Sequence, residues 1–222
     1  MHKAHTGIWM GGAFAMALAV AVTTLAVMGT GQSGTILGLQ LTARCSYGFF
    51  FLAYIGGPLT TLFGPVFRPI AKRGRDLGLA FAAAHLAHLS LVVWLYHISS
   101  RPPVSTFSAV YFGIAALFVY LIALFSIPRL FAMLPPLLWR LLLTVGMEYI
   151  ALAFLRDFLK YPFHHGLRIL LLYLPFVTLS CAALPLRMGA YIKRFAASRD
   201  QSHAVAPSAA ASTGRSCSGS LR

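Results

Sequence analysis

The chain has 222 residues, of which 59% are hydrophobic and only 10% are charged. A soluble domain carries about a quarter charged residues, so this composition excludes an ordinary soluble domain and indicates that much of the surface faces the lipid bilayer. The formal net charge of +14 fits nucleic acid or anionic lipid. Because the basic residues lie mainly between apolar segments, we expect lipid head groups and no nucleic acid as partner.

Six apolar segments follow one another along the chain, each near the roughly twenty residues that a bilayer core requires. They lie at about 8–28, 43–65, 76–96, 107–126, 137–156 and 167–189. Backbone polar groups in lipid have to be satisfied internally, so we expect helices. The predicted fold class is an all-α integral membrane protein, a six-transmembrane-helix bundle with short loops over residues 1–196. Residues 197–222, rich in Ala, Ser and Gly, predict a disordered cytoplasmic tail.

The first segment follows Lys3, as in a signal peptide. Its apolar run from Ile8 to Met28 is long for one, and no small-residue cleavage site follows, so we expect a retained helix. Six spans place both termini on one side, which collects eleven of the Lys and Arg residues near the spans. The five on the other side are Arg44, Arg101, Arg156, Lys160 and Arg168. This asymmetry predicts cytoplasmic termini in the inner (plasma) membrane.

Two histidines interrupt the third segment, which is otherwise apolar for about twenty residues after Asp76. An ionisable side chain in hydrocarbon marks a functional site by default, and imidazole is the usual axial ligand of haem iron. His85 and His88 share one helix face because they are three residues apart. Alanines on that side allow a neighbouring helix to approach, or leave room for a flat macrocycle. The alternative is that the histidines hydrogen-bond across helices to Ser, Thr or a carbonyl group.

Glu148 is the only acid within the hydrocarbon portion of any predicted span. A carboxylate there is costly unless it is protonated or paired. The third and fifth helices run in the same direction, and counting from their starts places Glu148 and His85 at similar depths. We therefore expect an intramembrane pair between Glu148 and His85 or His88. A hydrogen bond from a nearby Tyr or Ser is the alternative.

Two consecutive stretches resemble the ferric reductase-like transmembrane family. The first, residues 42–62, contains Gly56-Gly57-Pro58-Leu59, and the second reads Arg73-Gly74-Arg75-Asp76-Leu77-Gly78-Leu79 and is followed by His88. The chain is most similar to the haem-binding membrane subunits of bacterial periplasmic methionine-sulfoxide reductase systems. The resemblance covers roughly residues 40–160. It implies a b-type haem with His88 as iron ligand and His85 as an additional histidine.

The fifth helix departs from this family, whose members carry histidines there. Trp139 and Leu152 stand at the corresponding positions, so a bis-histidine haem cannot be assembled between the third and fifth helices. Three alternatives stay open. Met147 could be the second axial ligand, because His/Met ligation is an established arrangement. The haem could keep one open axial site, or a histidine elsewhere could bind it; the candidates are His97, His164 and His165.

Two classes of function follow. The first is the membrane electron-transfer subunit of an oxidoreductase, which passes electrons from a cytoplasmic reductase or a quinone towards an outer acceptor protein. The chain has no Gly-rich dinucleotide fingerprint, so flavin or nicotinamide chemistry would belong to a partner. The second is a haem-free membrane scaffold or partner-binding protein that kept the fold, with the histidines and Glu148 in a buried polar network.

Overall fold

The computed structural model describes residues 2–160 and 167–212, and residues 1, 161–166 and 213–222 lie outside the described part. The elements are α1 (His2–Met28), α2 (Gln32–Phe63), the 3-10 turn η1 (Pro65–Phe67), α3 (Arg68–Lys72), α4 (Gly74–Ile98), α5 (Thr106–Phe125), α6 (Pro128–Phe131), α7 (Pro136–Lys160) and α8 (Leu167–Ser212). Within the described part, six helices are long and apolar enough to cross a membrane: α1, α2, α4, α5, α7 and α8. The predicted all-α class with six spans is confirmed.

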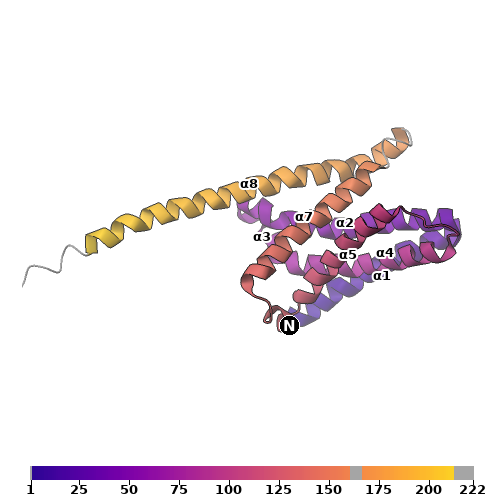
Figure 1. Ribbon diagram of the computed structural model, residues 1–222, viewed down its shortest axis with the longest axis horizontal. Helices are drawn as coiled ribbons and strands as arrows, with labels where there is room; N and C mark the ends of the chain where they lie inside the picture. The colour runs from indigo at the N-terminus through magenta and orange to yellow at the C-terminus, as the bar shows by residue number, and fades with distance from the viewer. Residues whose placement is uncertain (1, 161–166, 213–222) are drawn as a thin grey trace, which may run out of the picture.

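In Figure 1, α1, α2, α4 and α5 run side by side, and α7 and α8 lie along one flank of them. The contacts between the helices divide them into two groups, which meet where α8 packs on α2. In the first group, α4 packs closely on both α1 and α2, which also contact each other. In the second group, α5 packs on α7. Helix α8 runs along α2 and also contacts α7, whereas α4 and α5 touch only lightly. The backbones of α4 and α7 do not approach each other closely. Large side chains fill the space between these two helices.

Helix α2 begins at Gln32, well before the predicted start of the second span at about 43. Polar residues in its first half lower the hydropathy, but they satisfy their hydroxyl groups within the helix. Thr35 donates to the carbonyl of Gly31 at 2.9 Å, and Thr42 donates to that of Gly38 at 2.8 Å. Such bonds to the preceding turn keep a polar residue compatible with a buried helix. Hydropathy alone therefore placed this boundary too late.

An aromatic cluster fills the core between α2, α4, α7 and α8. Its buried members include Tyr47 and Phe50 in α2, Phe81 in α4 and Phe158 in α7. The rings of Tyr47 and Phe158 meet edge to face, with centroids 4.9 Å apart. Lipid tails are as apolar as these rings, so what holds the helices here is van der Waals packing and not exclusion from water.

Helix α8 continues past the predicted start of the tail at Ala197 as far as Ser212. Figure 1 shows this end of α8 projecting well beyond the bundle, on the side where α1 begins. Alanine is the strongest helix former, and it is the most frequent residue of this segment. The last residues of the predicted tail, 213–222, lie outside the described part.

Candidate functional site

The two histidines of α4 stack on each other, with ring centroids 5.3 Å apart and an angle of 17° between the planes. Nδ1 of His88 lies 3.0 Å from the hydroxyl of Thr42 in α2. The ring of His85 faces that of Tyr120 in α5, with centroids 6.3 Å apart. A hydrogen bond across helices to a threonine was one of the two sequence interpretations, and for His88 the structure contains that bond.

The small-residue face of α4 is covered by α1. Ala80, Ala84 and Ala87 are buried against Ala13 and Ala17. Small side chains on both helices let the two backbones approach closely. Of the two roles that the alanines suggested, close approach of a neighbouring helix is the one that the structure realises, and the room expected for a macrocycle is occupied by α1.

Glu148 has partners other than the predicted histidines. Tyr54 in α2 donates a hydrogen bond to its Oε2 at 2.5 Å. Nε of Arg187 in α8 lies 2.7 Å from Oε1, in an ion pair whose angle is not that of a hydrogen bond. Both carboxylate oxygens are thus engaged, and the predicted pair with His85 or His88 is wrong. The alternative, a hydrogen bond from a tyrosine, is confirmed.

The reason is a shift in depth between α4 and α7. Phe154 in α7 lies level with Phe81 in α4, with ring centroids 5.9 Å apart. Glu148 precedes Phe154 by about 9 Å along the helix, whereas His85 follows Phe81 by about 6 Å. The two groups are therefore separated by about 15 Å in depth, and counting residues from the helix starts could not reveal it.

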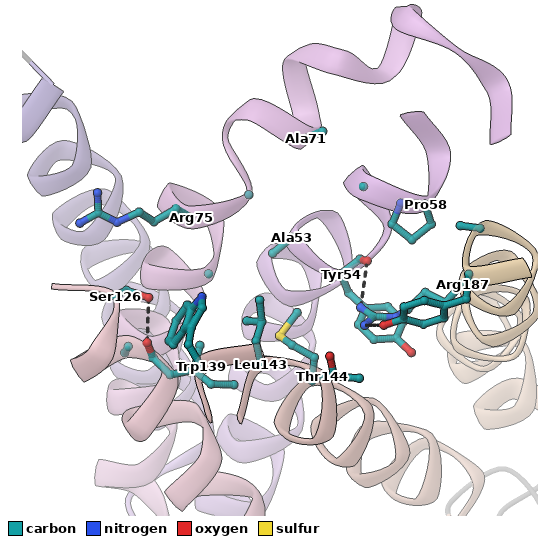
Figure 2. Close-up of a pocket in the computed structure, with 18 of the residues that line it drawn as sticks. Ala53, Tyr54, Pro58, Ala71, Arg75, Ser126, Trp139, Leu143, Thr144 and Arg187 are labelled. Atoms are coloured by element: carbon teal, nitrogen blue, oxygen red, sulfur yellow. Dashed lines mark hydrogen bonds between the residues drawn. The ribbon is translucent and has the colours of Figure 1, made fainter. Parts of the chain in front are cut away.

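A cavity of about 690 Å³ opens beside Glu148, where α7 diverges from α2 and α4. Its walls include small residues from several helices: Ala53, Gly57, Ala71, Gly74, Gly78 and Ala190. Figure 2 shows Trp139, Leu143 and Thr144 of α7 facing Ala53 and Tyr54 of α2 across the opening. Space of this size with mainly apolar walls can accept the hydrocarbon part of a ligand.

Three guanidinium groups border this cavity and differ in their partners. Arg187 is held by Glu148, donates to the hydroxyl of Tyr191 at 2.9 Å and lies over the ring of Tyr54 at 4.2 Å. Arg194 donates twice to the hydroxyl of Thr61, at 2.8 and 3.1 Å. Neither Arg194 nor Arg75 contacts a carboxylate among the described residues. The cavity therefore carries positive charge that no described acid neutralises.

The residues named as haem ligands do not converge in the described structure. Met147 lines the cavity and packs on the aromatic cluster, whereas neither His85 nor His88 lines that cavity. His97 is exposed at the end of α4, its ring beside Trp94 with centroids 5.9 Å apart. The remaining candidates, His164 and His165, lie outside the described residues.

A haem between α4 and α7 does not fit the side chains present. Phe81, Phe154 and Phe50 pack together in that space, with Phe50 and Phe81 centroids 5.2 Å apart. The Nδ1 atom of His85 is buried without a hydrogen-bond partner, as is the hydroxyl of Tyr120. The two rings are neighbours across α4 and α5, with centroids 6.3 Å apart, whereas the second ligand was expected on α7.

Sequence reasoning missed several polar residues inside the bundle. Arg44 was assigned to the outer side, yet it lies twelve residues into α2 with its guanidinium 4.4 Å from the centroid of Tyr173. Arg187 is one of the eleven basic residues assigned to the side of the termini, and Tyr54 lies within residues 42–62, which were considered only for the family resemblance. Helix α7 also extends past its predicted end, so Asp157 lies within the same apolar helix as Glu148. Tyrosine and arginine are common partners of an intramembrane acid when they lie at the same depth on neighbouring helices. The sequence does not give the relative depth of the helices, so it could not identify Tyr54 and Arg187 as the partners of Glu148.

Comparison of the chain with protein-family models, with curated proteins and with solved structures finds no match. The resemblance to the ferric reductase-like family thus stays a prediction from the motifs of α2 and α4.

Proposed function

We propose that this chain is a haem-free membrane protein that binds an amphipathic ligand in the cavity between α7 and the α2–α4 pair. The observation that carries the proposal is the cavity itself, about 690 Å³ with apolar walls and polar residues at its border. Ligand sites are typically concave and mostly apolar, with a few polar groups that fix orientation. The membrane supplies amphipathic molecules to such an opening directly.

The electron-transfer alternative has less support. It needs two axial ligands on one macrocycle, or one ligand beside an open site. Met147 lines the cavity and neither His85 nor His88 does, and the ring of His88 is stacked on His85. The bond between His88 Nδ1 and Thr42 is compatible with either function, because a histidine that binds iron through Nε2 also bonds its Nδ1 to a neighbour.

The haem-free alternative agrees with the contacts of His88 and Glu148, which are bonded to Thr42 and to Tyr54. His85 contributes ring contacts to His88 and Tyr120, and its Nδ1 atom has no hydrogen-bond partner among the described residues. This alternative differs from the expected network in one respect: Glu148 is bound to Tyr54 and Arg187, which line the cavity, and not to the histidines.

The proposal is tested by quenching of Trp139, one of the large residues of the cavity wall. The chain has three tryptophans, so the double variant Trp9→Phe, Trp94→Phe leaves Trp139 as the single fluorophore. An uncharged diacylglycerol with brominated chains, titrated into detergent-solubilised protein, quenches on contact. We expect saturable quenching of Trp139.

The cavity offers a matched pair of filling variants. A Cβ atom added at Gly78, which lines the cavity, meets nothing within 4 Å, and the same holds for Gly113 on α5 outside it. Gly78→Leu should therefore place side-chain atoms in the cavity and weaken saturable quenching, whereas Gly113→Leu should leave it unchanged. Equal quenching in both variants would show that the lipid touches Trp139 from outside, and the proposal would fail.

A further inference from the structure

We infer that the ligand of this cavity is an anionic phospholipid whose phosphate group is bound at Arg194. The inference rests on the proposed function and adds the chemical class of the head group. It starts from charge: Arg75, Arg187 and Arg194 border the cavity, and Glu148 is the only acid that contacts any of them among the described residues. Among the described side chains, Arg75 and Arg194 have no carboxylate partner.

The three arginines are not equivalent. Arg187 is fixed by Glu148, by Tyr191 and by the carbonyl of Tyr54, which Nη1 approaches at 3.5 Å. Its charge is already neutralised, so it is a positioning residue for the wall of the cavity. Figure 2 shows it turned toward Tyr54, at the opposite end of the cavity from Arg75. A ligand phosphate gains little from Arg187.

Arg194 is suited to bind a phosphate. Nε and one terminal nitrogen share the hydroxyl of Thr61, which is a neutral acceptor and leaves the charge uncompensated. The other terminal nitrogen has no partner among the described residues. The Thr61 bonds hold the planar guanidinium beside Gly57, whose added Cβ would lie 3.7 Å from Nη2. Guanidinium groups bind phosphate oxygens with charge-assisted, often paired hydrogen bonds.

The surroundings of Arg194 favour a lipid over a free phosphate. The side chains next to it on α8 include Tyr191, Ile192 and Phe195, which are 41%, 66% and 74% exposed. Beside it, the small residues of the cavity wall leave space for acyl chains. An uncharged quinone would leave the arginine charges unbalanced, so the positive border selects a head group with net negative charge.

The test is native mass spectrometry of the purified full-length protein with three probes of equal chain length: phosphatidylglycerol, phosphatidylcholine and diacylglycerol. We expect phosphatidylglycerol to bind about tenfold more tightly than diacylglycerol, which has no phosphate, a difference the size of one charge-assisted hydrogen bond. It should also bind more tightly than phosphatidylcholine, whose choline group cancels the charge of the phosphate. Arg194→Gln should remove this preference. The control is Arg140→Gln, which removes one positive charge from an exposed residue near the start of α7 that does not line the cavity. This variant should keep the preference.

The outcomes separate the two proposals. If all three lipids bind equally and Gly78→Leu weakens their binding, the cavity takes an amphiphile but the phosphate assignment is wrong. If Arg194→Gln and Arg140→Gln reduce the preference alike, the positive end as a whole attracts anionic lipid and Arg194 is no specific site. If no probe binds in a saturable way, the proposed function fails as well. Inorganic phosphate that competes as well as phosphatidylglycerol would assign the site to the free anion.

Discussion

Glu148 in α7 and Arg187 in α8 form an ion pair, with 2.7 Å between Oε1 and Nε. Tyr54 in α2 donates to the other carboxylate oxygen at 2.5 Å, and its ring lies under the Arg187 guanidinium. Three helices are therefore joined at one point beside the cavity. Removing one partner of such a pair leaves the other charge unpaired in a low-dielectric environment.

Glu148→Gln should lower the free energy of unfolding, because Arg187 then lacks its counter-charge. The Glu148 side chain is 32% exposed, so we expect a loss of about 1–3 kcal/mol and not the full cost of a deeply buried pair. The measurement is thermal or denaturant unfolding in detergent micelles. The double variant E148Q/R187Q should be less destabilised than the sum of the single variants. Strict additivity would mean that the two groups do not interact.

Two glycines allow close helix contacts, and they should respond differently to alanine. A Cβ at Gly56 would lie 3.2 Å from the backbone nitrogen of Ala71, whereas one at Gly146 would meet only side chains, with Ile122 Cδ1 at 2.8 Å. Side-chain ends can move and backbone cannot, so Gly56→Ala should cost about 1–3 kcal/mol of stability. Gly146→Ala should cost less, because the side chains of Ile122 and Phe118 can shift to make room. The same unfolding assay compares them, and a larger cost at Gly146 would contradict the α2–α3 contact.

Helix α7 offers a matched pair that tests which face it buries. Ile150 is 2% exposed in the aromatic cluster, and Leu152 is 46% exposed. Ile150→Ala removes packing atoms and leaves a cavity, so we expect a loss of about 2 kcal/mol or more. Leu152→Ala should change stability by no more than about 0.5 kcal/mol. If Leu152→Ala were the more destabilising of the two, α7 would be rotated about its axis relative to the orientation described here.

The orientation of the protein stays a prediction that a reporter can check. Arg75, Arg129 and Arg140 lie at the end of the bundle where α1 begins, and α8 leaves the bundle on this side. Excess Lys and Arg mark the cytoplasmic side. A fluorescent protein fused after residue 222 should fluoresce in the cytoplasm, and alkaline phosphatase fused there should be inactive. An active phosphatase would invert the topology.

The number and order of the spans could be predicted from the sequence, because twenty apolar residues and short loops leave few alternatives. The partners of Glu148 could not, since they depend on the depth of α7 relative to α4. That depth is set by contacts such as Phe154 on Phe81, which no count along a single helix contains. The start of α2 was missed for another reason: the hydroxyl of Thr42 bonds to its own helix and to His88, so a polar residue there does not end the span.

The central claim, that the cavity holds an anionic amphiphile and the histidines hold no haem, is tested most directly by native mass spectrometry of what the protein retains on mild extraction. The protein should be produced with haem precursor supplied, so that both ligands are available. We expect retained anionic phospholipid, less of it in Gly78→Leu, and no mass corresponding to haem. A haem adduct that persists in Gly78→Leu and disappears in His88→Ala would contradict the account.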